Sequence, residues 1–242
     1  MIAAFHSAGL GLAANQQRID DRAQNIANTD TVAYNAQETE FSDTLYAYYA
    51  QDGKEIAAGT GVKPVGTVSF PAQGAPEKTG RSLDLMIEGD GYFCVQDANG
   101  GLSYTRAGAF QRSEDGWLTT AGGCYVLDGQ LQRIPIEDEK AVSFSVSSSG
   151  GNGSAAEIGV FTFANPSGLV RQGENLLGAS PSSGTAVQTA TAEIRQGYLE
   201  RSTVDLAAEM SRMIQAQRGF QANARMIRAA DEIEETANQL RS

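Results

Sequence analysis

The sequence has little of the chemistry that builds metal sites or disulfide frameworks. Its 242 residues contain two cysteines, Cys94 and Cys124, no CxxC motif and a single histidine, His6. These residues are too few for a Cys/His metal site or a network of disulfides. One isolated disulfide and two buried thiols in strands remain as alternatives, and we favour the buried thiols. We expect no metal and no cofactor.

Positive charge and long apolar runs are also scarce. The chain carries 18 basic and 29 acidic residues, for a net charge of −11. Electrostatic attraction to nucleic acid or to an anionic membrane therefore has the wrong sign. No apolar run approaches the roughly 20 residues of a membrane helix, and no basic residue precedes the first apolar stretch as in a signal peptide. We expect no nucleic-acid partner, no membrane insertion and no cleaved signal peptide.

Proline is rare and glycine is abundant, with 6 and 27 residues respectively, which is typical of many tight turns. Between the chain ends, short segments rich in aromatic and β-branched residues alternate with turn signals, which predicts strands. The predicted strands are 83–87, 92–95, 102–105, 117–120, 125–127, 142–146, 158–163 and 186–191, and one of the turns is 147–154. The pattern predicts a mostly antiparallel β domain over 76–185, with extended connectors over 35–75 and 186–199.

The two chain ends have a helical period instead. Apolar residues recur at alternating steps of three and four, which predicts two long helices with a coiled-coil seam. The main seam positions are Ile2, Phe5, Leu12, Ile19 and Ile26, followed by Leu206, Met210, Met213, Phe220 and Ile227. Ser202 and Asp205 suit the start of the second helix, and Glu209 and Arg212 are expected on its outer face. The predicted fold is α+β, with a helical domain formed by 1–34 and 200–242.

The first predicted helix is apolar nearly all round, because its first 17 residues contain no Asp, Glu, Lys or Arg. Such a helix must be buried on several sides, and one partner helix covers only one of them. Each large side chain off the seam would contribute about 1.5–3 kcal/mol on full burial. Further copies of the chain are therefore expected to cover the remaining faces.

The second helix carries four acids near its end, Asp231, Glu232, Glu234 and Glu235, where the helix dipole favours cations. Its bases, which include Arg212 and Arg228, lie earlier in the helix. Staggered stacking of copies would bring these acids against the bases of a neighbour. The alternative is a solvated acidic helix end.

Three motifs, in order along the chain, resemble bacterial flagellar rod and hook proteins. They lie at 25–34, at 83–122 and at 196–223, and their key residues are Asn25, Asn28, Tyr34, Gly197, Tyr198 and Ser202. Within that family the last motif resembles the distal rod proteins most. Two departures leave open a paralogous proximal rod or hook-type protein. This chain has Ala33 where members usually have glycine, and Thr203 where they usually have asparagine.

The resemblance implies a non-enzymatic subunit of the flagellar basal body that polymerises helically into the drive shaft and transmits torque. Its terminal helices would line the inner tube of the periplasm-spanning rod, and its β domain would face outward. The implied partners are further copies, other rod and hook proteins and the flagellar type III export apparatus. Residues 43–66 occupy the place of a segment linked to rod stiffness. A secreted, oligomeric β-rich binding module is the alternative from another class.

An enzymatic interpretation depends on three carboxylates, Asp84, Glu88 and Asp90. Paired carboxylates of this kind can act as acid and base in hydrolysis. Gly89 and Gly91 make a tight turn the simpler explanation of this segment. The chain has no GxSxG motif, and its glycines fit neither a dinucleotide motif nor a phosphate loop. We therefore predict no catalytic residue.

Overall fold

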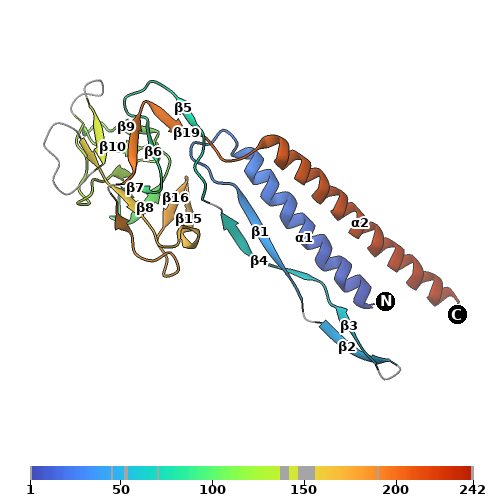
Figure 1. Cartoon of the computed structure of the whole chain (residues 1–242). Coiled ribbons are helices and arrows are strands. Elements are labelled where there is room, and N and C mark those ends of the chain that lie inside the picture. Colours follow the sequence, from blue (N-terminus) through green and yellow to red (C-terminus); the bar gives the residue numbers. More distant parts are fainter. Residues whose placement is uncertain are drawn as a thin grey trace. The chain divides into compact units, whose positions relative to one another are not determined.

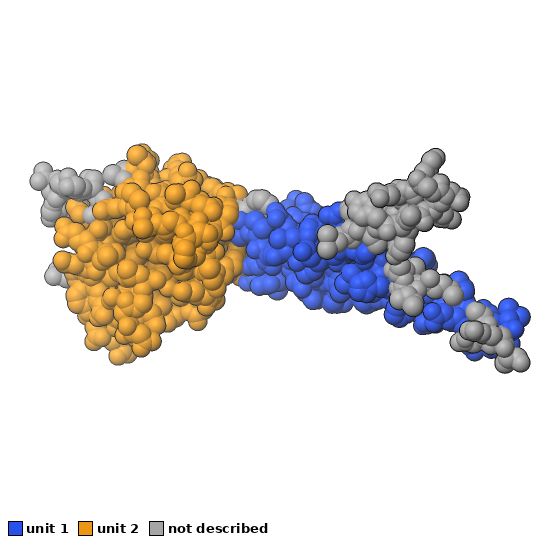
Figure 2. Space-filling view, turned by 90° about the horizontal axis from the view of Figure 1, so that it is seen from below, with its two compact units in different colours: residues 1–28, 36–69, 204–242 blue, residues 29–35, 70–203 orange. Residues whose placement is uncertain are grey.

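The computed structural model describes residues 2–44, 46–51, 54–69, 71–136, 142–146, 156–189 and 191–240. The turn predicted at 147–154 lies outside these residues. The chain forms two compact units (Figure 2). Unit 1 comprises residues 1–28, 36–69 and 204–242, and unit 2 comprises residues 29–35 and 70–203. Two long helices together with antiparallel β structure confirm the predicted α+β class.

Unit 1 contains both long helices, α1 (Ile2–Ala27) and α2 (Leu206–Gln239). They lie side by side and antiparallel, with the two chain ends at the same end of the pair (Figure 1). The carboxylate of Asp205 accepts hydrogen bonds from the backbone N–H groups of Ala207 (3.0 Å) and Ala208 (3.2 Å). Asp205 is therefore the N-cap of α2, and the predicted cap role of Ser202 is wrong because the helix begins four residues later.

Close contacts fix the register of the two helices. Gly11 on α1 lies against Asn223 on α2, and Gly219 on α2 lies against Asn15 on α1. A Cβ atom at either glycine would come within 2.8 Å of the facing asparagine. In this antiparallel register Ile2 lies level with about residue 232, since each helix advances by the same rise per residue. The last turns of α2 therefore extend past the start of α1.

Unit 1 also contains two antiparallel strand pairs. β1 (Gln37–Asp43) pairs with β4 (Val62–Ser69), and β2 (Tyr46–Gln51) pairs with β3 (Lys54–Gly59). β1 and β4 pack against α1 (Figure 1). The expected connector thus contains ordered strand pairs, and one of them covers a face of the first helix.

Unit 2 is built on a nine-stranded antiparallel sheet with the order β15-β16-β8-β7-β11-β10-β9, in which β14 pairs with β7 and β17. Shorter pairs join β6 to β18 and β5 to β19, and the parallel pair β12-β13 departs from the antiparallel pattern. The strands of unit 2 are β5 (Pro76–Lys78), β6 (Leu85–Glu88), β7 (Tyr92–Gln96), β8 (Leu102–Thr105), β9 (Phe110–Arg112), β10 (Leu118–Thr120), β11 (Tyr125–Val126), β12 (Phe144–Val146), β13 (Ala156–Ile158), β14 (Val160–Thr162), β15 (Val170–Gly173), β16 (Leu176–Gly178), β17 (Val187–Gln188), β18 (Glu193–Gln196) and β19 (Tyr198–Glu200), with a 3-10 turn at η1 (Pro166–Gly168).

The core of unit 2 is apolar and aromatic. Phe93 and Phe110 are fully buried, with ring centroids 5.1 Å apart in an edge-to-face arrangement. Cys94 and Cys124 are buried free thiols, as the favoured alternative predicted, but only Cys94 lies in a strand, since Cys124 directly precedes β11. Burial raises the pKa of the Cys94 thiol to about 12. The sequence analysis missed the strands β5, β9, β15, β16, β18 and β19, because all of them are short and three of them expose most of their residues.

Candidate assembly site

The interior of unit 1 is small and polar rather than apolar. Among its described residues, the buried apolar side chains are two alanines, Ala14 and Ala216. The buried polar residues of unit 1 are Asp21, Arg22, Asn25, Thr39 and Glu209. Few large apolar side chains are therefore left to stabilise the helix pair from inside.

An ionic cluster joins α1, α2 and β1 within this interior. The Arg22 guanidinium donates through Nη1 to both carboxylate oxygens of Glu209 (3.2 and 3.3 Å) and through Nη2 to Glu38 (2.6 Å). Arg212 donates to the same Glu209 carboxylate at 2.8 Å. The sequence prediction that Glu209 lies on the outer face of α2 is wrong, because its carboxylate is buried against α1. Its side chain is 4% exposed, whereas that of Arg212 is 53% exposed.

The pKa of Arg22 reflects two opposing effects. Burial lowers it by penalising the charged form, while the negative charge of Glu209 and the hydrogen bonds to Glu38 and Glu209 raise it. The net result is a pKa above the ordinary value of arginine. Arg22 is thus a buried cation whose charge is balanced mainly by the buried Glu209 and, to a lesser degree, by the half-exposed Glu38.

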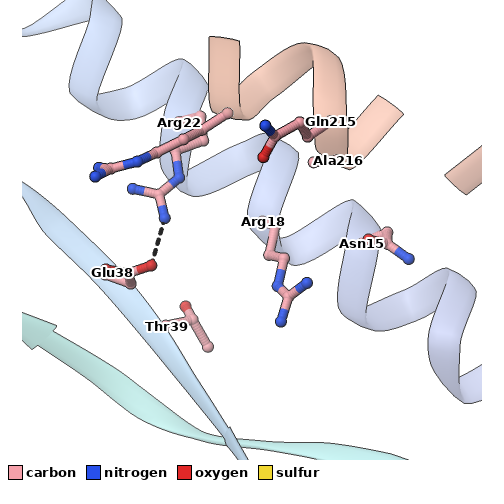
Figure 3. A pocket seen from close by; sticks show the side chains of 8 residues that line it. Asn15, Arg18, Arg22, Glu38, Thr39, Gln215 and Ala216 are labelled. Carbon is pink, nitrogen blue, oxygen red and sulfur yellow. Dashed lines mark hydrogen bonds and ion pairs between the residues drawn. The ribbon is translucent and has the colours of Figure 1, made fainter. Parts of the chain in front are cut away.

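Beside this cluster is a pocket of ≈ 340 Å³ between α1, α2 and β1. Figure 3 shows Arg18 and Arg22 projecting from α1 on the side of β1, with the dashed bond from Arg22 to Glu38. The Arg18 guanidinium lies 4.8 Å from the centroid of the Phe41 ring. The residues that line the pocket are Asn15, Arg18, Arg22, Glu38, Thr39, Arg212, Gln215 and Ala216.

The described large apolar residues of the two helices are either exposed or half-buried, and none of them is fully buried. The predicted seam residues Phe5, Leu206 and Met210 are exposed, whereas Leu12, Ile19, Ile26, Met213, Phe220 and Ile227 are half-buried. The side chain of Ile2 lies outside the described part of the structure. Three further apolar residues of α2 are exposed, namely Ile214, Met226 and Ile233, and so is Leu240 just after the helix. No described residue of the predicted seam is thus fully buried within one chain.

Comparison with known proteins agrees with the motif pattern. Residues 195–240 match the family "Flagellar basal body rod FlgEFG protein C-terminal", and residues 86–151 match "Flagellar hook protein FlgE/F/G D1 domain". The flagellar basal-body rod protein FlgG of Bacillus subtilis (strain 168) is 35% identical, with 96% of this chain and 97% of that protein aligned. The FlgG and FlgF proteins of Caulobacter vibrioides (strain ATCC 19089 / CIP 103742 / CB 15) are 31% and 32% identical, over 99% and 92% of this chain and 99% and 91% of their own lengths. This chain belongs to the flagellar basal-body rod protein family.

The rod protein is accordingly a structural subunit of the flagellar basal body, and its family is not an enzyme class. The resemblance to distal rod proteins is confirmed by the FlgG relatives, since FlgG is the distal rod member of the family. Among the described residues, no helix is both long and apolar enough to cross a membrane.

Two asparagines of the family motif belong to unit 1. The Asn25 amide donates to the carbonyl of Gln37 (2.9 Å) and to Glu209 (3.1 Å), and its oxygen accepts from the N–H of Gln37 (2.9 Å). Asn25 therefore fixes the start of β1 beside α1 and α2. Asn28 donates to the carbonyl of Gln24 at 2.8 Å, at the end of α1.

The other motif residues lie in unit 2 of the rod protein. Tyr34 is buried, with the Arg171 guanidinium 5.2 Å from its ring centroid. Gly197 has φ = +79°, a conformation that favours glycine, and separates β18 from β19. Tyr198 opens β19 opposite Lys78. Ser202 is half-buried in the segment before α2.

A second buried ion pair in unit 2 was missed by the sequence. The Glu200 carboxylate accepts from Arg106 Nε (2.9 Å) and from the N–H of Gly74 (2.8 Å). Arg106 also donates to the carbonyl of Gly89 at 2.9 Å. Arg106 and Glu200 are far apart in the sequence and belong to no common motif, so only the fold reveals that they pair.

The three carboxylates of the enzymatic interpretation have separate environments. Asp84 is buried with Arg81 at 3.6 Å, Glu88 pairs with Arg195, and Asp90 is exposed at the bend before β7. Within the described ranges, no group of three or more His, Cys, Asp or Glu residues could hold a metal ion.

Proposed function

We propose that this chain polymerises helically through its terminal helices to form the distal part of the flagellar drive shaft. The observation that carries this proposal is the distribution of apolar side chains in unit 1. Its described interior contains two alanines and polar residues, while five large apolar side chains of α2, and Leu240 just after it, are exposed. Leu206, Met210 and Ile214 recur every four residues and so lie along one face of α2, and a continuous exposed apolar face of this kind is typical of a protein interaction site.

The exposed side chains of α2 provide a sizeable driving force. Leu206, Met210, Ile214, Met226 and Ile233 are 41–62% exposed, and Leu240 is 89% exposed. Covering the exposed half of each contributes about 1 kcal/mol, so the six contribute about 6 kcal/mol per subunit before the costs of association. Sister subunits would cover these exposed side chains. Head-to-tail contacts between identical copies generate an open helix, so the same contact can repeat along a rod.

Several finer features follow from the family and stand as proposals. The helices pair with each other and with sister helices as coiled coils that line an inner tube, and the β domain 76–185 faces outward. Residues 43–66 brace neighbouring subunits and stiffen the shaft. The partners are other rod and hook proteins and the type III export apparatus, which takes the chain without cleaving a signal peptide.

The test removes apolar surface without touching the interior. A Met210→Gln/Ile214→Gln variant changes two exposed side chains of α2, and a Val170→Gln/Val187→Gln variant makes an equivalent change at valines of unit 2 that are 57% and 59% exposed. We expect the α2 variant to raise the concentration needed for polymerisation at least tenfold and to abolish swimming in cells that depend on it. The valine variant should polymerise and swim as the unaltered protein does.

Circular dichroism melting of dilute, monomeric samples provides the control for folding. Both variants should melt within a few degrees of the unaltered protein, because exposed positions contribute little to monomer stability. Failure of the unaltered protein to polymerise, or normal assembly of the α2 variant, would refute the proposal. Retained ligand binding without assembly would favour the binding-module alternative.

A further inference from the structure

We propose, as a consequence of the proposed function, that the arginine pocket of unit 1 receives the acidic end of α2 from a second copy of the chain. The pocket is the one lined by Arg18, Arg22 and Arg212, and the occupant is the segment 231–235 of the sister subunit. The contact is heterologous, because each copy offers one pocket and one acidic end. It therefore continues from copy to copy along a polymer.

The pocket contains more basic groups than acidic groups. Its lining contains three guanidiniums and one carboxylate, that of Glu38, and Arg22 pairs both with Glu38 and with Glu209 beside the pocket. Within the described part of the chain, Arg18 forms no ion pair, and its guanidinium lies over the Phe41 ring. Arg212 uses Nη1 for Glu209, and an arginine has five N–H donors in all. A carboxylate entering this pocket would meet donors that the fold already holds in place.

The acidic end of α2, in turn, has carboxylates without basic partners among the described residues. The side chains of Asp231, Glu232, Glu234 and Glu235 are exposed, and α2 has no basic residue in its last turn. None of these four acids forms an ion pair among the described residues; Glu235 accepts a hydrogen bond from Gln239 at 3.3 Å. In the register of the two helices, Glu234 and Glu235 extend past the start of α1, so a second copy can approach this end of α2 from several sides.

The shape of the helix end suits a docked position. Asp231 and Glu235 are four residues apart and share one face of α2. Met226, Ile233 and Leu240 are seven residues apart and, at 3.6 residues per turn, share the opposite face. One face can therefore enter a polar pocket while the other stays available to apolar surface of another copy.

The same chain cannot satisfy this contact. Asp231 lies 19 residues after Arg212 on one helix, which is about 28 Å at the helical rise. A sister copy shifted along the axis by about 30 Å would place its acids at the pocket. The remaining bases of α2, such as Arg225 and Arg228, are exposed on the open helix surface, where ion pairs contribute little.

Intermolecular disulfide formation tests the geometry. Gln215→Cys places a thiol at the pocket, and Glu235→Cys places one on the acidic end of the same chain. Twenty residues, or about 30 Å of helix, separate the two, far beyond disulfide reach, so any bond between them joins two copies. The buried Cys94 and Cys124 should not compete. The matched control pairs Glu235→Cys with Gln221→Cys, which is exposed on α2 outside the pocket.

Diamide oxidation of assembled protein should give a ladder of cross-linked oligomers for the 215/235 variant, at least tenfold more than for the 221/235 control. Equal yields, or no ladder while the protein still polymerises, would overturn the proposed contact and leave the proposed function standing. Failure of the unaltered protein to polymerise would overturn both.

Charge exchange tests the chemistry. Arg18→Glu/Arg212→Glu should raise the polymerisation threshold at least tenfold, equivalent to about 1.4 kcal/mol, and adding Asp231→Arg/Glu235→Arg should restore it to within threefold. Since Arg212→Glu also disturbs Glu209, the rescue is the decisive measurement. A quadruple variant no better than the double variant would refute the contact.

Discussion

Removal of the Glu209 carboxylate tests whether the ionic cluster holds unit 1 together. The side chains of Glu209 and Arg22 are 4% and 9% exposed, so Glu209→Ala leaves a buried guanidinium with Glu38 as its remaining partner in the cluster. Breaking a buried pair on one side costs about 3–5 kcal/mol. Because Glu38 remains, we expect a loss of about 3 kcal/mol in the free energy of unfolding.

Two variants calibrate this value. Glu38→Ala removes the other partner of Arg22, but the Glu38 side chain is 51% exposed, so its loss should cost about 1 kcal/mol or less. Arg22→Met/Glu209→Met removes both charges together. It should cost less than Glu209→Ala, since no buried charge is left unpaired.

Urea unfolding, followed by two probes, measures these losses. Far-ultraviolet circular dichroism reports mainly on the long helices of unit 1, whereas Trp117, the only tryptophan of the chain, reports on unit 2. The losses should appear in the helical signal. A Glu209→Ala variant no less stable than Glu38→Ala would refute the reasoning.

Two further predictions concern unit 2. Ala33 has φ = +54°, a conformation that costs roughly 1–2 kcal/mol for a residue with a Cβ atom. Ala33→Gly should therefore stabilise unit 2 by about 0.5 kcal/mol in urea unfolding followed by Trp117, after the greater entropy of glycine in the unfolded chain is deducted. Burial raises the pKa of Cys94 to about 12, whereas an unfolded thiol ionises near pH 8.5. Its contribution to stability is thus complete below pH 8.5 and falls by about 1.4 kcal/mol per pH unit toward pH 12, a slope that Cys94→Ala should remove in alkaline urea titrations.

Each prediction has a clear contrary result. A less stable Ala33→Gly protein would mean that the left-handed conformation costs less than the added chain entropy. An equal alkaline slope in the Cys94→Ala protein would mean that other groups, such as the buried phenol of Tyr104, account for the loss.

The sequence by itself determined the helices and the class of fold. The seven-residue apolar pattern located α1 and α2 to within a few residues, because helical periodicity is a local property. Alternation and turn residues located β7 and β8 equally well. The shorter, exposed strands of unit 2 escaped detection, since their pairing depends on neighbours distant in the chain.

The face on which the helices meet was decided by tertiary structure. Apolar spacing marked Phe5, Leu206 and Met210 as seam residues, but it cannot say whether the seam is completed within one chain or between copies. In the folded chain, Gly11 and Gly219 allow the close approach of the helices.

The buried cluster was likewise beyond the reach of sequence patterns. Arg22 and Glu209 are 187 positions apart, and each resembles an ordinary surface charge in its own helix. Burial follows only when α1, α2 and β1 come together, because a charge is stable inside a protein when its partners are already in place. Local spacing thus determined the elements of this rod protein, and long-range pairing decided which of their faces are left for neighbours.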